Sequence, residues 1–91
     1  MEFSIRFTEE GRRTLHTLHI ENQNRIKTKL KELAKNLNLG KKLTGRLSGF
    51  YTMHIGKNRA ICSIDKDTIF VHHVGNRKDV YVKILDRKLH T

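Results

Sequence analysis

The sequence predicts an α+β domain of two layers with the element order β-α-α-β-β-β. Three observations lead to this fold class: a short alternating segment near the N-terminus, apolar residues spaced by three and four over residues 26–37, and three alternating segments joined by tight turns over residues 50–74. A helical pair covering one face of a four-stranded, mainly antiparallel sheet accounts for all three. The 91 residues contain no proline or repeat, so we expect one domain spanning residues 1–91.

The N-terminal segment alternates apolar and polar side chains over residues 3–7, which predicts a half-buried strand. Thr8 is a suitable N-cap for the helix that follows, and the two glutamates after it suit a first helical turn. Leu15 and Leu18 give this helix a narrow apolar stripe.

A second helix is indicated by one continuous apolar face. This face consists of Ile26, Leu30, Leu33, Ala34 and Leu37. Asn22 or Asn24 could cap its start, and Asn38 and Gly40 should end it. The basic stretch 41–49 that follows contains two glycines and is expected to be a linker.

Two turns in succession predict a three-stranded antiparallel meander. The strands are expected at residues 50–55, 59–64 and 68–74. A short tail, also expected to be helical, covers residues 79–89.

If Gly56 and Lys57 form the tip of the first hairpin, Ile55 faces Asn58 and His54 faces Arg59. One side of the hairpin is then apolar and should meet the helices. The other side carries Phe50, Thr52, His54, Arg59, Ile61 and Ser63. A histidine beside an arginine on the uncovered side is an unusual use of sheet surface. Cys62 falls on the apolar side and is expected to be a core residue.

Positive charge dominates the composition, with a formal net charge of +10. Residues 1–40 carry eight basic and five acidic side chains, and residues 41–91 carry eleven basic and four acidic ones. This balance favours a polyanionic or acidic partner, and a domain of this size has little room for a deep substrate cavity. A single cysteine, no apolar run of about 20 residues and no signal-like N-terminus lead us to expect a cytoplasmic protein.

The segments KKLTGRLSGFYTMHIGKNRAICSI and VHHVGNRKDVY together resemble the RelE/ParE toxin superfamily of type II toxin–antitoxin systems. The shared pattern is a basic K-L-x-G segment, a strand ending in a turn, a strand that opens with arginine, and a closing V-G-x-R-x-x-x-Y. The strand–helix–helix lead-in has the same order, so the resemblance covers essentially the whole chain.

The resemblance favours the RelE-like branch, whose members cut mRNA in the ribosomal A site without a metal. It assigns catalytic roles to Arg59, Arg77 and Tyr81. Two lysines common in the RelE site are replaced here by Thr52 and His54. Histidines serve in other mRNA-cutting members, so His54 is a candidate catalytic replacement, and the same departure leaves open an inactive or differently acting branch.

The chemistry of RNA cleavage explains why these residue types are suitable. Attack by the 2′-hydroxyl needs a base for its proton, an acid for the departing 5′-oxygen, and cations around the phosphate. Arginine presents a planar charged fork to phosphate oxygens, and histidine or tyrosine can move protons. Candidate RNA and phosphate contacts are Lys41, Lys42, Arg46, Phe50, Thr52 and Lys78. No cofactor and no metal site are expected.

Three function classes remain open at this stage. The first is a toxin that cuts mRNA on the ribosome and is neutralised by an acidic antitoxin protein. The second is a ParE-like toxin that binds DNA gyrase and cuts nothing; the replaced lysines favour it. The third is a plain RNA-binding module, for which Phe50 is the one clear stacking residue on the uncovered side.

Overall fold

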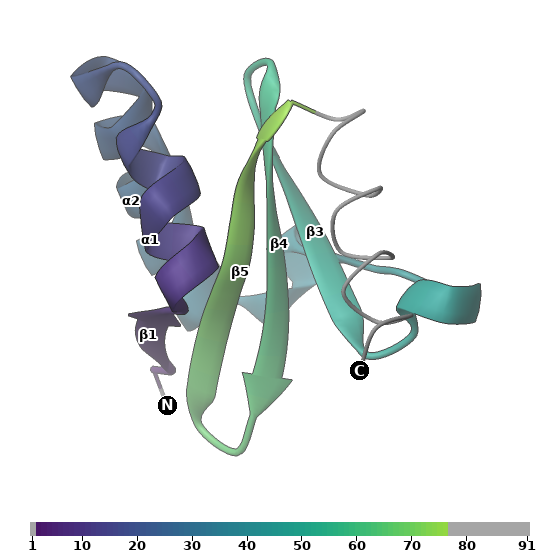
Figure 1. Ribbon diagram of the computed structural model, residues 1–91. Coiled ribbons are helices and arrows are strands. Elements are labelled where there is room, and N and C mark those ends of the chain that lie inside the picture. Colours follow the sequence, from purple (N-terminus) through teal and green to yellow (C-terminus); the bar gives the residue numbers. More distant parts are fainter. Residues whose placement is uncertain (1, 77–91) are drawn as a thin grey trace.

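The computed structural model describes residues 2–76 and shows a mixed five-stranded sheet with two helices on one face (Figure 1). The strand order is β1-β5-β4-β3-β2. The elements are β1 (Ser4–Phe7), α1 (Glu9–His16), α2 (Ile20–Lys35), the 3₁₀ turn η1 (Leu37–Leu39), β2 (Lys41–Lys42), the 3₁₀ turn η2 (Gly45–Leu47), β3 (Phe50–Ile55), β4 (Asn58–Asp65) and β5 (Thr68–Asn76). The two-layer α+β class is confirmed. The predicted helix at 79–89 lies outside the described residues.

The predicted register of the first hairpin is confirmed at every position. His54 pairs with Arg59, Ile55 with Asn58 and Tyr51 with Cys62. Gly56, the first tip residue, has φ +62°, a conformation in which glycine avoids the steric cost of a Cβ. β1 pairs in parallel with β5, and the other neighbouring strands pair antiparallel.

The prediction of four strands missed β2, which forms the outer edge beside β3. Lys41 pairs with Thr52 and Lys42 with Tyr51, and the N–H of Leu43 donates to the carbonyl of Phe50 at 2.9 Å. The expected linker 41–49 is therefore partly ordered as β2 and η2. A two-residue strand contains too few positions for alternation to be visible in the sequence.

The predicted start of α1 is correct, but Leu18, which was expected on this helix, lies beyond its C-cap Thr17, and both ends of α2 differ from the prediction. Thr8 is the N-cap of α1, and its side chain accepts from the N–H of Gly11. The start of α2 was placed too late by the sequence, since the helix begins at Ile20 with His19 as N-cap and without a side-chain capping bond. Its end was placed too late as well, because Asn36 adopts an extended conformation and its side chain accepts from Asn38 to start η1.

The main core lies between the helices and the sheet. It contains Leu15, Ile26, Leu30, Leu33, Ala34, Met53, Ile55, Ala60, Cys62, Ile69, Val71 and Val74. Cys62 is 1% exposed, as predicted, and burial raises the pKa of its thiol to about 12.

The opposite face of the sheet, called the open face below, is less bare than the sequence suggested. Ile61 is fully buried there, with Leu43, Leu47 and Phe50 packed against it. The segment that contains β2 and η2 thus covers the middle of this face. No helix among residues 2–76 is long and apolar enough to cross a membrane.

Candidate functional site

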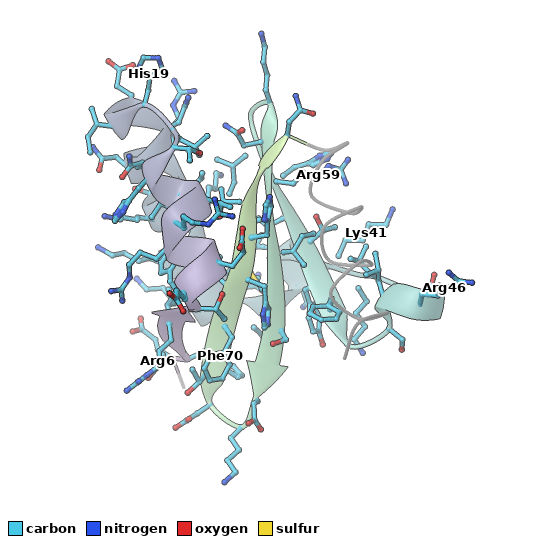
Figure 2. The ribbon with its side chains drawn as sticks, in the orientation of Figure 1. Arg6, His19, Lys41, Arg46, Arg59 and Phe70 are labelled. Carbon is cyan, nitrogen blue, oxygen red and sulfur yellow. The ribbon has the colours of Figure 1, made fainter. Side chains whose placement is uncertain are left out.

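A histidine and an arginine form a cross-strand pair near the tip of the β3–β4 hairpin. His54 and Arg59 face each other across the two strands, and so project to the same side of the sheet. On its other side Arg59 pairs with Gly75 of β5. His54 is exposed and Arg59 is half-buried. Figure 2 shows Arg59 and Lys41 on the side of the sheet away from the helices.

These two residues share one groove with predicted phosphate ligands. A groove of about 240 Å³ is lined by Leu39, Lys41, Thr52, His54 and Arg59. We call it the His54–Arg59 groove. Lys41 comes to it because β2 pairs with β3 at Thr52. The strand β2 therefore completes the groove. The sequence alone did not predict this strand or its part in the groove.

Thr52 contributes a hydroxyl to the His54–Arg59 groove. The residue is 4% exposed, and its Oγ1 has no hydrogen-bond partner among residues 2–76. Leaving a buried hydroxyl unsatisfied costs about 1–3 kcal/mol. A ligand oxygen would recover part of that free energy only after neighbouring side chains moved, because Oγ1 is shielded from solvent in this structure.

The other predicted contact residues of the described chain lie apart from this groove. Lys42 and Phe50 line a second groove of about 360 Å³ together with residues 43, 48, 49, 51 and 64. Arg46 lies on η2 and lines neither groove; Figure 2 shows it at the far end of η2. The structure therefore groups Lys41 and Thr52 with His54 and Arg59, and separates Lys42, Phe50 and Arg46 from them.

A histidine contact that the sequence did not single out explains the position of Phe50. The β4–β5 ladder has an irregularity at Ile61/Cys62, opposite the histidine pair of β5. His72 Nε2 lies 2.6 Å from Ser63 Oγ, and its ring meets Phe50 edge-on with centroids 5.3 Å apart. Phe50 packs against both Ile61 and His72, so it is a packing residue here and only partly available for stacking on a base.

His72 and His73 have different environments, as expected of neighbours on one strand. His73 is 4% exposed and its Nδ1 lies 3.8 Å from Glu10 Oε1 of α1. Within residues 2–76 no three His, Cys, Asp or Glu side chains are grouped so that they could hold a metal ion. Arg77, Lys78 and Tyr81 lie outside the described residues.

The chemical capacity of the His54–Arg59 groove follows from its lining. Two cations, Lys41 and Arg59, can neutralise a phosphate, and the guanidinium can engage two of its oxygens. Imidazole is the side-chain group that most often transfers protons in enzymes, and His54 is the residue that brings one to this groove. The Thr52 hydroxyl can donate to a further oxygen. This set matches a phosphodiester better than a neutral small molecule.

Comparisons with a protein-family model and with solved structures identify the family and the fold. The family model for the ParE toxin of the type II toxin–antitoxin system parDE matches residues 5–81. Among proteins with curated descriptions, no significant match was found.

Solved toxins of this kind have the same fold. The toxin–antitoxin complex RelBE2 from Mycobacterium tuberculosis contains a chain that is 27% identical, with a TM-score of 0.75, covering 85% of this chain and 100% of that one. The RelB–RelE complex from Methanococcus jannaschii gives 26% identity and a TM-score of 0.68, covering 85% and 95%. A double mutant of E. coli RelE in the free state gives 24% identity and a TM-score of 0.79, covering 96% and 98%. The chain therefore belongs to the ParE toxin family of type II toxin–antitoxin systems, within the RelE/ParE superfamily.

Proposed function

We propose that this toxin is a metal-independent endoribonuclease that cleaves mRNA on the ribosome. The observation that carries the proposal is the His54–Arg59 groove, in which a proton-transfer group, two cations and a buried hydroxyl meet on the open face. Such preorganised charge is often the largest contribution to phosphoryl chemistry.

The reaction we propose is internal transesterification. The 2′-oxygen attacks the adjacent phosphorus while a base takes its proton. The bond from phosphorus to the 5′-oxygen breaks, and an acid protonates that oxygen. The products are a 2′,3′-cyclic phosphate and a 5′-hydroxyl end. His54 is proposed as the base, with Arg59 and Lys41 stabilising the charge on the phosphate.

Arg77 and Tyr81 are proposed to complete the site, on the resemblance to the RelE-like branch. Arg77 would provide a second charged fork for the phosphate, and Tyr81 would orient the RNA or protonate the leaving oxygen. Lys78 is proposed as a further phosphate contact, and Arg46, Lys42 and Phe50 as contacts for more distant parts of the RNA. Arg46, Lys42 and Phe50 lie outside the His54–Arg59 groove and are therefore proposed as subsidiary contacts.

A cognate antitoxin is the second partner that we propose. Two of the solved structures that this chain resembles are complexes of a RelE-type toxin with its RelB antitoxin, and the net charge of +10 favours an acidic partner. An antitoxin segment that folds as it wraps the toxin would cover the His54–Arg59 groove and block RNA entry.

The test is incubation of the purified toxin with ribosomes programmed with a defined mRNA. The buffer contains a chelator, and its free magnesium concentration is held at the level that ribosomes need. Transition metals are then removed while ribosomes stay intact. We expect cleavage with 5′-hydroxyl products that is dependent on the ribosome. Intact mRNA under conditions in which the toxin remains folded would contradict the proposal.

A second candidate function, binding to DNA gyrase without cleavage, is favoured by two observations. The matching family model is that of ParE toxins, and Thr52 and His54 occupy positions where RelE-like sites carry lysines. The same purified toxin is therefore added to a gyrase supercoiling reaction. Inhibition of supercoiling together with intact mRNA would select this alternative.

A further inference from the structure

A third groove lies next to the first, between α2 and the tip of the β3–β4 hairpin. It has a volume of about 470 Å³ and is lined by Asn24, Arg25, Thr28, Lys29, His54, Ile55 and Gly56. We call it the α2 groove. His54 lines both this groove and the His54–Arg59 groove, so the two grooves meet at one side chain.

The edge strand β2 ends close to the point where the two grooves meet. β2 pairs with β3 only at Tyr51 and Thr52. Beyond Thr52, no strand among the described residues pairs with the outer edge of β3. A chain that lies across the His54–Arg59 groove can therefore pass around this edge at His54 and reach α2 without crossing another strand.

The polar residues of α2 in this groove form one surface. Asn24, Thr28, Arg25 and Lys29 are spaced by three and four positions, so they share a helix face. None of the salt bridges within residues 2–76 involves Arg25, and Glu21, one turn earlier, does not pair with it. Lys29 Nζ lies 3.2 Å from Glu32 Oε2 at the outer end of the surface. Arg25 is therefore the more available cation for an anionic ligand.

A different face of α2 is less suited to a polyanion. Lys31 and Lys35 line a groove beside β1 that also includes Glu2, and Lys35 lies 3.8 Å from that carboxylate. Positive charge on the β1 side therefore faces Glu2, whereas Arg25 on the hairpin side is in no salt bridge within residues 2–76 and shares its groove with His54. Charge complementarity selects the hairpin side for phosphate.

We propose that the α2 groove is a second RNA subsite, which holds the nucleotide next to the scissile phosphate. Arg25 contacts a phosphate oxygen, and Asn24 and Thr28 supply hydrogen bonds to the sugar or base. His54 stands between the two subsites and contacts the RNA where it turns around β3. This inference rests on the proposed ribonuclease function and adds to it a binding surface on α2.

The test compares Arg25→Gln with Arg6→Gln in cleavage of ribosome-bound mRNA. Both arginines are exposed, and Arg6 lies on β1, on the opposite side of the molecule from Arg59 in Figure 2. We expect Arg25→Gln to raise KM, and so to lower kcat/KM by about three- to tenfold, because one charge-assisted phosphate contact is lost. The kcat at saturation should remain that of the wild type, and Arg6→Gln should match the wild type in both constants.

Crosslinking identifies what the groove holds. Programmed ribosomes carry an mRNA with a 2′-deoxynucleotide at the cleaved position and 4-thiouridine immediately beside it. We expect irradiation to join this nucleotide to the peptide that contains residues 24–29, and Arg25→Gln to weaken the crosslink.

Three outcomes separate the two hypotheses. Cleavage by the wild type with unchanged kinetics for Arg25→Gln overturns the subsite and leaves the proposed function intact. Unchanged cleavage combined with weaker binding of the antitoxin by Arg25→Gln also overturns it, because the groove then serves the protein partner. Absence of cleavage by the wild type overturns the proposed function and the subsite with it.

Discussion

At the scale of single residues, the same amino-acid type has different roles according to its place in the sheet. His54 is exposed at the outer edge of β3 and lines two grooves. His73 is buried against Glu10 of α1, and His72 bonds to Ser63 beside the ring of Phe50. Among the histidines of residues 2–76, only His54 combines exposure with an arginine that faces it across a strand pair, and this combination makes it the proposed proton-transfer group.

The role of His54 predicts a pH dependence of cleavage. A base must be neutral to accept the 2′-hydroxyl proton, so single-turnover cleavage by the wild type should slow as pH falls and the imidazole becomes protonated. His54→Gln should be slower by about 10²–10⁴-fold and should lose this acid limb. Measured rates across about pH 5 to 9 provide the comparison. An unchanged acid limb in His54→Gln would assign the base to another group.

Cys62 predicts the opposite behaviour, that of an unreactive side chain. It is 1% exposed and burial raises the pKa of its thiol to about 12, so the nucleophilic thiolate is disfavoured. We expect no alkylation by iodoacetamide in the folded protein near neutral pH and complete alkylation in denaturant. Because the unfolded thiol ionises at lower pH than the folded one, stability should also fall as pH rises from about 9 towards 12. Rapid alkylation of the native protein would show that the core opens at this strand.

At the scale of elements, α1 is attached to β5 by backbone contacts that leave no spare volume. A Cβ on Gly11 would lie 2.0 Å from the carbonyl oxygen of Val71. Thr8 donates to that same carbonyl, and the N–H of Val74 donates to Thr14 Oγ1 at 3.0 Å. The first helix thus satisfies hydrogen-bond groups on β5 beyond the point where β1 ends.

Gly11→Ala should therefore destabilise the fold. In an unconstrained helix the substitution would stabilise by about 0.5–1 kcal/mol, but here the methyl group must displace β5 backbone. We expect a net loss of about 2–4 kcal/mol in the free energy of unfolding, measured by urea denaturation. Lys27→Ala, on an exposed part of α2, is the control and should change stability by under about 0.5 kcal/mol. A Gly11→Ala protein as stable as the wild type would mean that α1 does not pack closely on β5.

Helices and strands could be predicted from the sequence where the periodic spacing of apolar residues extends over enough positions to be recognised. The hairpin register followed from alternation and a two-residue tip, so the His54–Arg59 pair could be predicted from the sequence. The strand β2 could not, because Lys41 and Lys42 are two residues whose pairing with β3 depends on the whole fold. Two features of the site depend on that strand and could not be predicted from the sequence. Lys41 lies beside Thr52, and two grooves meet at His54.

At the scale of the whole molecule, positive charge and open grooves replace a deep active site. The chain carries a net charge of +10, and the four grooves described above open at the surface. A small domain of this kind can hold a polyanion on its surface without a large internal cavity.

This charge predicts strongly salt-dependent binding to RNA. The logarithm of the association constant for a single-stranded RNA should fall linearly with the logarithm of salt concentration, with a slope of about −0.7 for each phosphate neutralised. Replacement of Arg59 by Gln should reduce the slope by the contribution of about one phosphate. Fluorescence anisotropy over a salt series measures both slopes, and an Arg59→Gln slope equal to that of the wild type would place Arg59 outside the RNA path.

The most direct test of the central claim is mapping of mRNA 5′ ends in cells after induction of the wild type, Arg59→Ala and the control Arg6→Ala. We expect growth arrest and new 5′ ends within translated regions for the wild type and for Arg6→Ala. Arg59→Ala should lose both while remaining soluble and folded, since loss of a transition-state contact with phosphate costs several kcal/mol. Growth arrest by the wild type without new 5′ ends, or the same ends with Arg59→Ala, would contradict the assignment of the His54–Arg59 groove as a ribonuclease site.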